Sequence, residues 1–481
     1  MAVIGKVRFF LVLSGTLVND VVSFVVFCLL DLLDAVLCYV YKVADFVIEA
    51  EWRPCYCSSA RGAIASSGGK ILVSERGESK LVNLSSSKVM LEEVSDTLYA
   101  RTSLVSELSL CTVKRLKPAD RPPAAAVSSY RGGGKTTGRS LRSSAFTVNS
   151  TIIELLQGKA SVSRPIPRWS DCVCSRCTSW TSRGRQQTLF VREAGAKDGA
   201  QEDVLFIHGF ISSSQFWTET LFPHFSESAK ATYRLLAMDL LGFGRSPKPS
   251  DSLYTLREHL EKIERSVLEP YRVKSFHIVA HSLGCILALA LAVKHPGSVK
   301  SLTLLAPPYY QVPKGVQATQ YVMRKVAARK VWPPMAFGAS LTCWYEHITR
   351  TACLVVSKNH RLWESITKIV TMNRIRTYMF DGFFCHTHHA AWHTLHNVIC
   401  GTAGKLDGYL DAVNDRLSCG VTIFHGMDDE LIPLECSHDI QKRIQRAVVK
   451  EIENKDHLTI VIGRQEAFAR ELEEIWRKCG N

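Results

Sequence analysis

Ser282 stands in a sequence context that suits a nucleophile. Residues 276–279 predict a buried strand, and residues 286–293 predict an apolar helix that follows the turn. A serine in a sharp strand-to-helix turn exposes its hydroxyl, and small residues are needed two positions to either side. Ala280 and Gly284 meet this need. A Ser-x-Gly sequence alone marks only a turn, so the nucleophile hypothesis depends on the strand, the helix and suitable partners.

A serine hydroxyl is a poor nucleophile until a base removes its proton and an acid orients that base. For this strand-turn-helix arrangement the chain order is serine, acid, histidine. His457 follows a predicted strand at 448–452 and is the expected base. Asp429 lies in the turn after a predicted strand at 421–424 and is the preferred acid, with the adjacent Asp428 as the alternative.

Two backbone amides are expected to stabilise the negative charge that develops on an attacked carbonyl. The amide of Leu283, directly after the serine, is one, and the amide of Phe210 is the expected second. Gly209 allows close approach of the backbone, while the side chain of His208 is expected to be structural or to face the substrate. His281 precedes the serine and is expected near the site.

The elements that must position these residues begin near residue 188, where short apolar strands alternate with helical segments. This alternation predicts an α/β fold with a mostly parallel sheet. Strands are expected at 204–207, 233–238, 276–279, 299–305, 421–424 and 448–452. Thr255 and Glu258 form a capping box at the start of a helix, and 465–477 predicts the last helix. Asp239 and Arg245 follow a strand and are expected to be structural.

Residues 306–417 form an insertion before the acid-bearing strand, and its helical, aromatic composition predicts a cap over the site. Caps of this kind shape an acyl pocket and exclude water. Eight residues are candidates for its lining, although packing in the core of the cap is the preferred interpretation for any single one. They are Met323, Trp332, Trp344, Trp363, Met379, Phe380, Phe383 and Phe384.

Four histidines of the cap recur at helical spacing, namely His386, His389, His393 and His396. Metal binding is one interpretation. Packing, hydrogen bonding or substrate contact is preferred because acidic ligands are sparse nearby, so the sequence predicts no metal and no cofactor.

The first fifty residues direct the chain to a membrane or to secretion. Lys6 and Arg8 precede a long apolar run in which Asp20, Asp31 and Asp34 fall on one narrow helical stripe. A signal peptide is the preferred interpretation, although no clear cleavage site follows the run. An uncleaved signal anchor, or a helix that lies on a membrane or on the catalytic domain, are the alternatives.

Residues 51–185 predict a basic, serine-rich linker. The chain has a net charge of +14, of which 21 basic and 10 acidic residues in this segment supply +11. No nucleic-acid motif accompanies the charge, so a membrane or cell-wall surface is the favoured partner. Cys172, Cys174 and Cys177 predict disulfides, with a zinc site as the alternative.

The motifs from residue 186 to 481 together resemble the α/β-hydrolase fold. The cysteine cluster with Trp180, the histidine-rich segment 383–396 and the apolar leader resemble the plant BODYGUARD family. That family is regarded as extracellular α/β-hydrolases needed to build the cuticle, often labelled probable lysophospholipases. The resemblance implies an epidermal cell-wall role in cutin formation.

These observations favour a serine esterase, lysophospholipase-like hydrolase or acyltransferase that acts on lipid or hydroxy-fatty-acid esters. The expected location is the secretory pathway and the cell wall, with anchoring at the cell surface as a variant. The competing hypothesis is a non-catalytic protein of the same fold that binds a lipid or scaffolds other enzymes. A nucleic-acid partner is not expected.

Overall fold

The structure is a computed structural model. It describes residues 2–49, 70–75, 78–83, 95–99, 147–148, 188–196, 202–249, 252–357, 359–372 and 376–479. The cysteine cluster at 172–177 and most of the predicted linker lie outside these residues.

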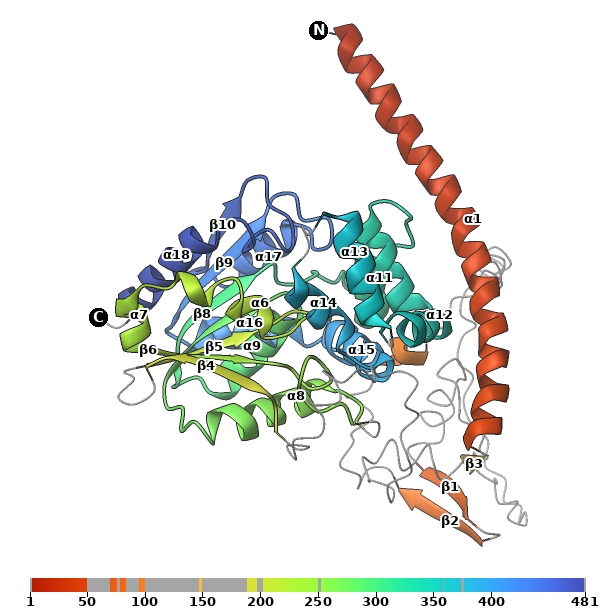
Figure 1. Ribbon diagram of the computed structural model, residues 1–481, viewed down its shortest axis with the longest axis horizontal. Helices are drawn as coiled ribbons and strands as arrows, with labels where there is room; N and C mark the ends of the chain where they lie inside the picture. The colour runs from red at the N-terminus through yellow and green to blue at the C-terminus, as the bar shows by residue number, and fades with distance from the viewer. Residues whose placement is uncertain are drawn as a thin grey trace, which may run out of the picture.

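A seven-stranded sheet forms the centre of the molecule (Figure 1). Its strands are β4 (Val191–Gly195), β5 (Glu202–Ile207), β6 (Tyr233–Met238), β7 (Phe276–His281), β8 (Val299–Leu305), β9 (Gly420–Gly426) and β10 (Val448–Ile452). They are ordered β10-β9-β8-β7-β5-β6-β4, and every neighbouring pair is parallel except β4 with β6. The mostly parallel sheet confirms the predicted α/β-hydrolase fold class.

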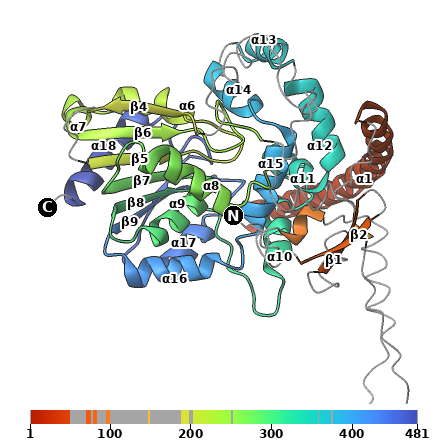
Figure 2. The same ribbon diagram turned by 90° about the horizontal axis from the view of Figure 1, so that it is seen from below.

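Helices cover both faces of this sheet (Figure 2). One face carries α8 (Leu256–Ile263), η6 (Glu264–Leu268), α9 (Leu283–Lys294), α16 (Leu406–Arg416) and α17 (Glu435–Arg443). The other carries α6 (Gln215–Thr218), η5 (Phe222–His224), α7 (Glu227–Thr232) and α18 (Gln465–Cys479). The capping box predicted at Thr255 is present at the start of α8.

The strand β5 shows why both faces must be covered. Val204 and Phe206 point into the core that holds Trp476 of α18, whereas Leu205 and Ile207 point into the core formed with α9. Successive strand residues alternate between faces, so the continuous apolar run 204–207 requires helices on both sides of the sheet.

The insertion between β8 and β9 is helical, as predicted. Its elements are α10 (Ala318–Val326), α11 (Pro334–Trp344), α12 (Glu346–Ala352), η7 (Cys353–Ser357), α13 (His360–Val370), α14 (Thr377–Phe384), α15 (His388–Thr394) and η8 (Leu395–Cys400). The cap meets the sheet domain at a bridge between Phe243 and His386. The next helix, α16, packs on α9 of the sheet domain.

The N-terminal helix α1 (Ala2–Glu49) runs beside α11 and α12 of the cap (Figures 1 and 2). Within it, Gly15–Tyr41 is long and apolar enough to cross a membrane by length and composition.

Parts of the predicted linker are folded. A small sheet joins β1 (Lys70–Glu75), β2 (Glu78–Asn83) and β3 (Thr147–Val148) in the order β2-β1-β3. The short helix η3 (Asp96–Tyr99) is held in the cap, where the amide of Ser95 donates to Asn397 Oδ1 at 2.9 Å. Leu98 is buried there. The segment predicted as a linker therefore contains ordered elements, and η3 is held by the Ser95 hydrogen bond and by the burial of Leu98.

Candidate active site

Ser282 forms the turn between β7 and α9. Its backbone has φ 52° and ψ −120°, a conformation that a residue with a side chain rarely adopts. Strain of this kind persists only where the surroundings impose it. The turn is held by the amide of Ser282, which donates to the Leu305 carbonyl at 2.9 Å.

Gly284 allows this turn to sit close to the sheet. A Cβ atom at Gly284 would lie 2.7 Å from the carbonyl oxygen of Ile207 and 2.8 Å from that of His208. A Cβ at Gly209 would lie 2.9 Å from His281 Nδ1 and 3.2 Å from Ser282 Cβ. Both glycines therefore permit close packing of backbone around the serine.

The structure brings Asp429 and His457 together, although 28 positions separate them. His457 Nδ1 donates to Asp429 Oδ2 at 2.7 Å. The other carboxylate oxygen, Oδ1, accepts from the amides of Leu431 and Ile432, each at 2.9 Å. Burial favours a higher pKa for Asp429, but the hydrogen bond and charge of His457 and the Ile432 amide hold this pKa below its usual range.

The neighbouring Asp428 has a different environment. It is exposed, while the Asp429 side chain is fully buried beside His457. The amide of Asp428 donates to the Lys455 carbonyl at 2.9 Å, so this residue fastens the turn after β9 to the loop that carries His457. The geometry favours Asp429 as the acid.

His281 lies against the ring of His457, with ring centroids 4.7 Å apart. Its Nε2 donates to the backbone carbonyl of His457 at 2.8 Å, and its ring stacks on Phe216. Burial lowers the pKa of His281 to about 3, so its imidazole is neutral at physiological pH. It can therefore position the His457 loop without adding a charge to the site.

His208 also has a structural environment. The Leu240 amide donates to its Nε2 at 2.9 Å, and its Nδ1 donates to the Gly209 carbonyl at 2.7 Å. Burial lowers its pKa, although the charge of Asp239 opposes this. The ring connects the loop after β5 with the loop after β6.

Asp239 fixes two loops through backbone amides. Its Oδ1 accepts from Ser214 at 2.6 Å, and its Oδ2 accepts from the Arg245 amide at 2.7 Å. The structural role predicted for both residues agrees with these bonds. Ser214, which Asp239 binds, lies four residues after Phe210 in the same loop. The side chain of Phe210 lines the cavity.

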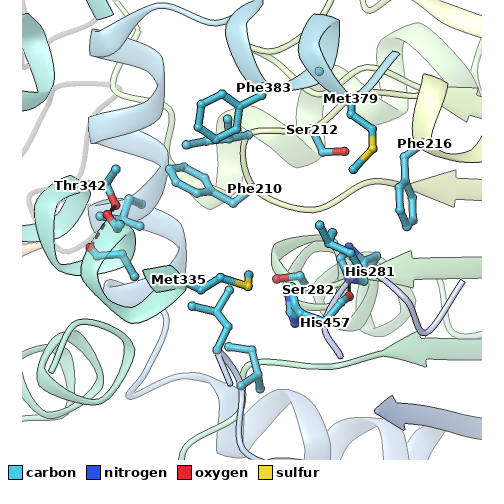
Figure 3. Close-up of a pocket in the computed structure, with 18 of the residues that line it drawn as sticks. Phe210, Ser212, Phe216, His281, Ser282, Met335, Thr342, Met379, Phe383 and His457 are labelled. Carbon is cyan, nitrogen blue, oxygen red and sulfur yellow. Dashed lines mark hydrogen bonds between the residues drawn. The ribbon is translucent and has the colours of Figure 1, made fainter. Parts of the chain in front are cut away.

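Ser282 and His457 both line one cavity of about 500 Å³ (Figure 3). Figure 3 shows the two side chains beside each other, with His281 close by and Phe210, Met335 and Phe383 across the cavity. The described residues show no hydrogen bond between Ser282 Oγ and His457. Such contacts are often long in a free enzyme and shorten when substrate binds.

The cavity lining is mostly apolar and comes largely from the cap. Of the eight predicted lining residues, Met379, Phe380, Phe383 and Phe384 of α14 contribute to it. The other four do not line this cavity, and they are Met323, Trp332, Trp344 and Trp363.

The four candidates that do not line the cavity have other surroundings, and two of them pack in the core, as was preferred for any single candidate. Met323 and Trp344 are buried in the hydrophobic core, where the indole of Trp344 donates to the Ala327 carbonyl. Trp332 and Trp363 are exposed. Composition alone could not separate a residue that faces the cavity from one that faces the core or the surface.

Several residues of the site carry no sequence signal. Phe216 supports His281 by stacking, and Met335 and Ala339 of α11 line the cavity. Leu431 and Ile432 supply the amides that orient Asp429. Aliphatic and aromatic residues occur throughout the chain, so only their position in three dimensions identifies them.

The four predicted cap histidines do not converge on a common point. His386 Nε2 lies 3.8 Å from Cys353 Sγ, His389 Nε2 donates to the Ser252 carbonyl, and His396 Nδ1 bonds Thr97 Oγ1. The ring of His393 lies beside that of His389, with centroids 4.1 Å apart and an angle of 49° between the ring planes. Among the described residues no group of three or more His, Cys, Asp or Glu side chains could hold a metal ion.

Comparisons with known proteins agree with this architecture. The family model of the alpha/beta hydrolase fold matches residues 204–336. "Probable lysophospholipase BODYGUARD 3" of Arabidopsis thaliana is 56% identical, and the match covers 98% of each chain. "Probable lysophospholipase BODYGUARD 1" of the same plant is 55% identical, with 96% of each chain covered.

Among solved structures, MenH from S. aureus is similar to this chain, with 16% sequence identity and a TM-score of 0.43. The match covers 60% of this chain and 99% of the MenH chain.

Proposed function

Because the chain belongs to the BODYGUARD family of α/β-hydrolase-fold proteins, we propose that it is a serine hydrolase of lipid esters. The observation that carries this proposal is the strained Ser282 in an apolar cavity that also holds His457 bonded to Asp429. The "lysophospholipase" in the names of the relatives supports a lipid ester as substrate.

In the proposed reaction Ser282 Oγ attacks the ester carbonyl carbon, and its proton passes to Nε2 of His457. Asp429 keeps the other imidazole nitrogen protonated and stabilises the cation that forms. The amides of Phe210 and Leu283 donate to the developing oxyanion. Collapse of this intermediate releases the alcohol, which takes the proton from His457, and leaves an acyl-serine.

The second half of the reaction determines the product. Water that loses its proton to His457 attacks the acyl-serine and yields the free acid. A hydroxyl group of a sugar or hydroxy-fatty acid in place of water yields acyl transfer. The apolar lining suits an acyl chain in either case.

Fluorophosphonate labelling of the full-length protein tests the nucleophile. We expect the wild type to be labelled and Ser282→Ala to lose both label and ester hydrolysis, the latter by at least about 10³-fold. Ser228→Ala, on the exposed surface of α7, is the matched control and should be labelled normally. An unlabelled wild type, or a labelled Ser282→Ala, would contradict the proposal.

A non-catalytic lipid-binding role is the second candidate, favoured by the apolar cavity, which suits an acyl chain whether or not a reaction follows. We place the physiological role of the hydrolase in cuticle formation at the epidermal cell wall. Expression of Ser282→Ala in a plant that lacks the protein separates the two candidates. Failure to restore the cuticle supports catalysis, whereas full restoration supports lipid binding alone.

A further inference from the structure

The helix α1 has two faces of different chemistry. Its polar and partly buried residues from Asn19 to Tyr41 contact the cap. At about 100° per residue these contacts fall within roughly one third of the helix circumference. The opposite half exposes apolar side chains between Gly15 and Tyr41, with the phenol of Tyr39 near its end. Among the apolar side chains are Val18, Phe24, Val25, Leu29, Leu32 and Val36.

Asp31 makes the central contact of the docked face. Its carboxylate forms an ion pair with Arg329, in which one guanidinium nitrogen lies 2.8 Å from both oxygens. The hydroxyl of Tyr345 donates to Asp31 Oδ1 at 2.8 Å. Phe27, one turn before Asp31, packs against Phe337 and Tyr345. The side chains of Arg329 and Asp31 are 17% and 14% exposed, so the ion pair is largely shielded from water.

Asp34 makes a second contact one turn further along. It is buried, and Oδ1 accepts from the amides of His347 and Ile348 at 3.0 and 3.2 Å. Both amides lie in the first turn of α12, so the carboxylate caps that helix. Ser23 Oγ accepts from the Val331 amide at 3.0 Å, and the Tyr41 hydroxyl bonds Thr351 at 2.8 Å. The contacts therefore extend along the whole apolar segment.

These contacts are incompatible with a helix that crosses a bilayer while docked. A crossing α1 would carry the adjacent cap surface, with the charged groups of Arg329 and Arg350, into the hydrocarbon. Charged groups at that depth are costly. An undocked crossing helix would instead leave Asp31 and Asp34 without partners near its midpoint.

The exposed face is too uniformly apolar for a protein partner. Protein interfaces are only about 56–65% apolar and have a polar rim, whereas the outward half of α1 offers neither charge nor side-chain amide over about 40 Å of helix. A helix with one docked face and one apolar face suits the interface plane of a bilayer.

We propose that α1 is retained in the mature protein and lies in the plane of a membrane, with its apolar face in one leaflet and its polar stripe fastened to the cap. The helix α11 then stands between the membrane anchor and the substrate cavity. Phe337 of α11 meets Phe27, while Met335 and Ala339 of the same helix line the cavity. This placement holds the cavity wall close to the lipid surface.

Topology in sealed secretory vesicles tests the proposal, with one epitope tag ahead of α1 and another after α18 in the full chain. We expect both tags on the mature protein, both protected from protease in sealed vesicles and both digested once the vesicles are opened. Loss of the first tag would mean a cleaved leader. Its digestion in sealed vesicles would mean a crossing helix, and either result overturns the proposal.

Two sets of variants test the faces separately. Asp31→Ala with Asp34→Ala should lower the melting temperature in detergent by about 5 °C or more, whereas the exposed Asp20→Ala, as matched control, should not.

Val25→Lys with Leu32→Lys should keep the wild-type melting temperature but weaken binding to neutral phosphatidylcholine vesicles by at least about tenfold. Undiminished vesicle binding, with or without self-association through this face, overturns the proposal.

These readouts use no ester substrate, so loss of Ser282 labelling would leave them unaffected. Failure of the membrane placement would likewise leave the proposed hydrolase activity open.

Discussion

At the scale of single residues, adjacent carboxylates with the same chemistry have different environments. Asp429 is buried, accepts two backbone amides and meets the imidazole of His457. Asp428 is exposed on the same turn, and its backbone rather than its carboxylate makes the contact to Lys455. The two therefore give a matched pair for testing the acid.

Asp429→Asn should reduce kcat for ester hydrolysis by about 10⁴-fold, because the amide cannot hold His457 in the tautomer that accepts the serine proton. Asp428→Asn should change kcat by less than about twofold, because the Asp428 side chain is exposed and does not contact His457. Steady-state kinetics on a soluble ester measures both. Equal losses in the two variants would count against the assignment of Asp429.

At the scale of elements, the site depends on close packing between the turn that follows β7 and the end of β5. Ser282 is strained and still lines the cavity, because α9 begins directly after it and approaches the carbonyls of Ile207 and His208. Gly284 makes that approach possible. Gly297, in the exposed turn after α9, has open space around the same position and serves as the control.

Gly284→Ala should lower the free energy of unfolding by about 1–3 kcal/mol, because its methyl group would press on two backbone carbonyls that cannot move independently. Gly297→Ala should be neutral or slightly stabilising. Denaturant titration of both variants measures the difference. If Gly284→Ala were as stable as the wild type, the close packing of α9 on β5 would be wrong.

At the scale of the whole molecule, folding buries many histidines in neutral form. Burial lowers the pKa of His259, His281 and His396 to about 3 each. In the unfolded chain each imidazole takes up a proton near its ordinary pKa of about 6.5. The unfolded state therefore binds more protons between these values, and stability falls as the pH falls from about 6.5 toward 3.

When the pH is lowered from 7.5 to 5.5, we expect each of these three histidines to lower the free energy of unfolding by about 1.4 kcal/mol. Denaturant titration at the two pH values measures the sum. His259→Gln should reduce the pH dependence, whereas His224→Gln, at an exposed position, should leave it unchanged. Stability that is equal or higher at pH 5.5 would contradict this account.

The amino-acid sequence was enough to predict the six parallel strands and the order of the chemical groups along them, but not the antiparallel edge strand β4. Strand periodicity is a local property, and the carboxyl ends of parallel strands meet at one edge of a sheet. Placing Ser282, Asp429 and His457 directly after three such strands therefore predicted that they would meet. The turn at Ser282 was likewise predictable, because its requirement for small neighbours is local.

Which side chains of the cap face the cavity, the core or the solvent could be learned only from the three-dimensional arrangement of its helices. Met323 and Phe383 are both apolar and both lie on cap helices, yet only Phe383 lines the cavity. The same holds for α1, where the aspartate stripe was visible in the sequence but its partners Arg329 and His347 were not. Helix periodicity identifies a face, whereas the surface that covers this face depends on residues some 300 positions away in the chain.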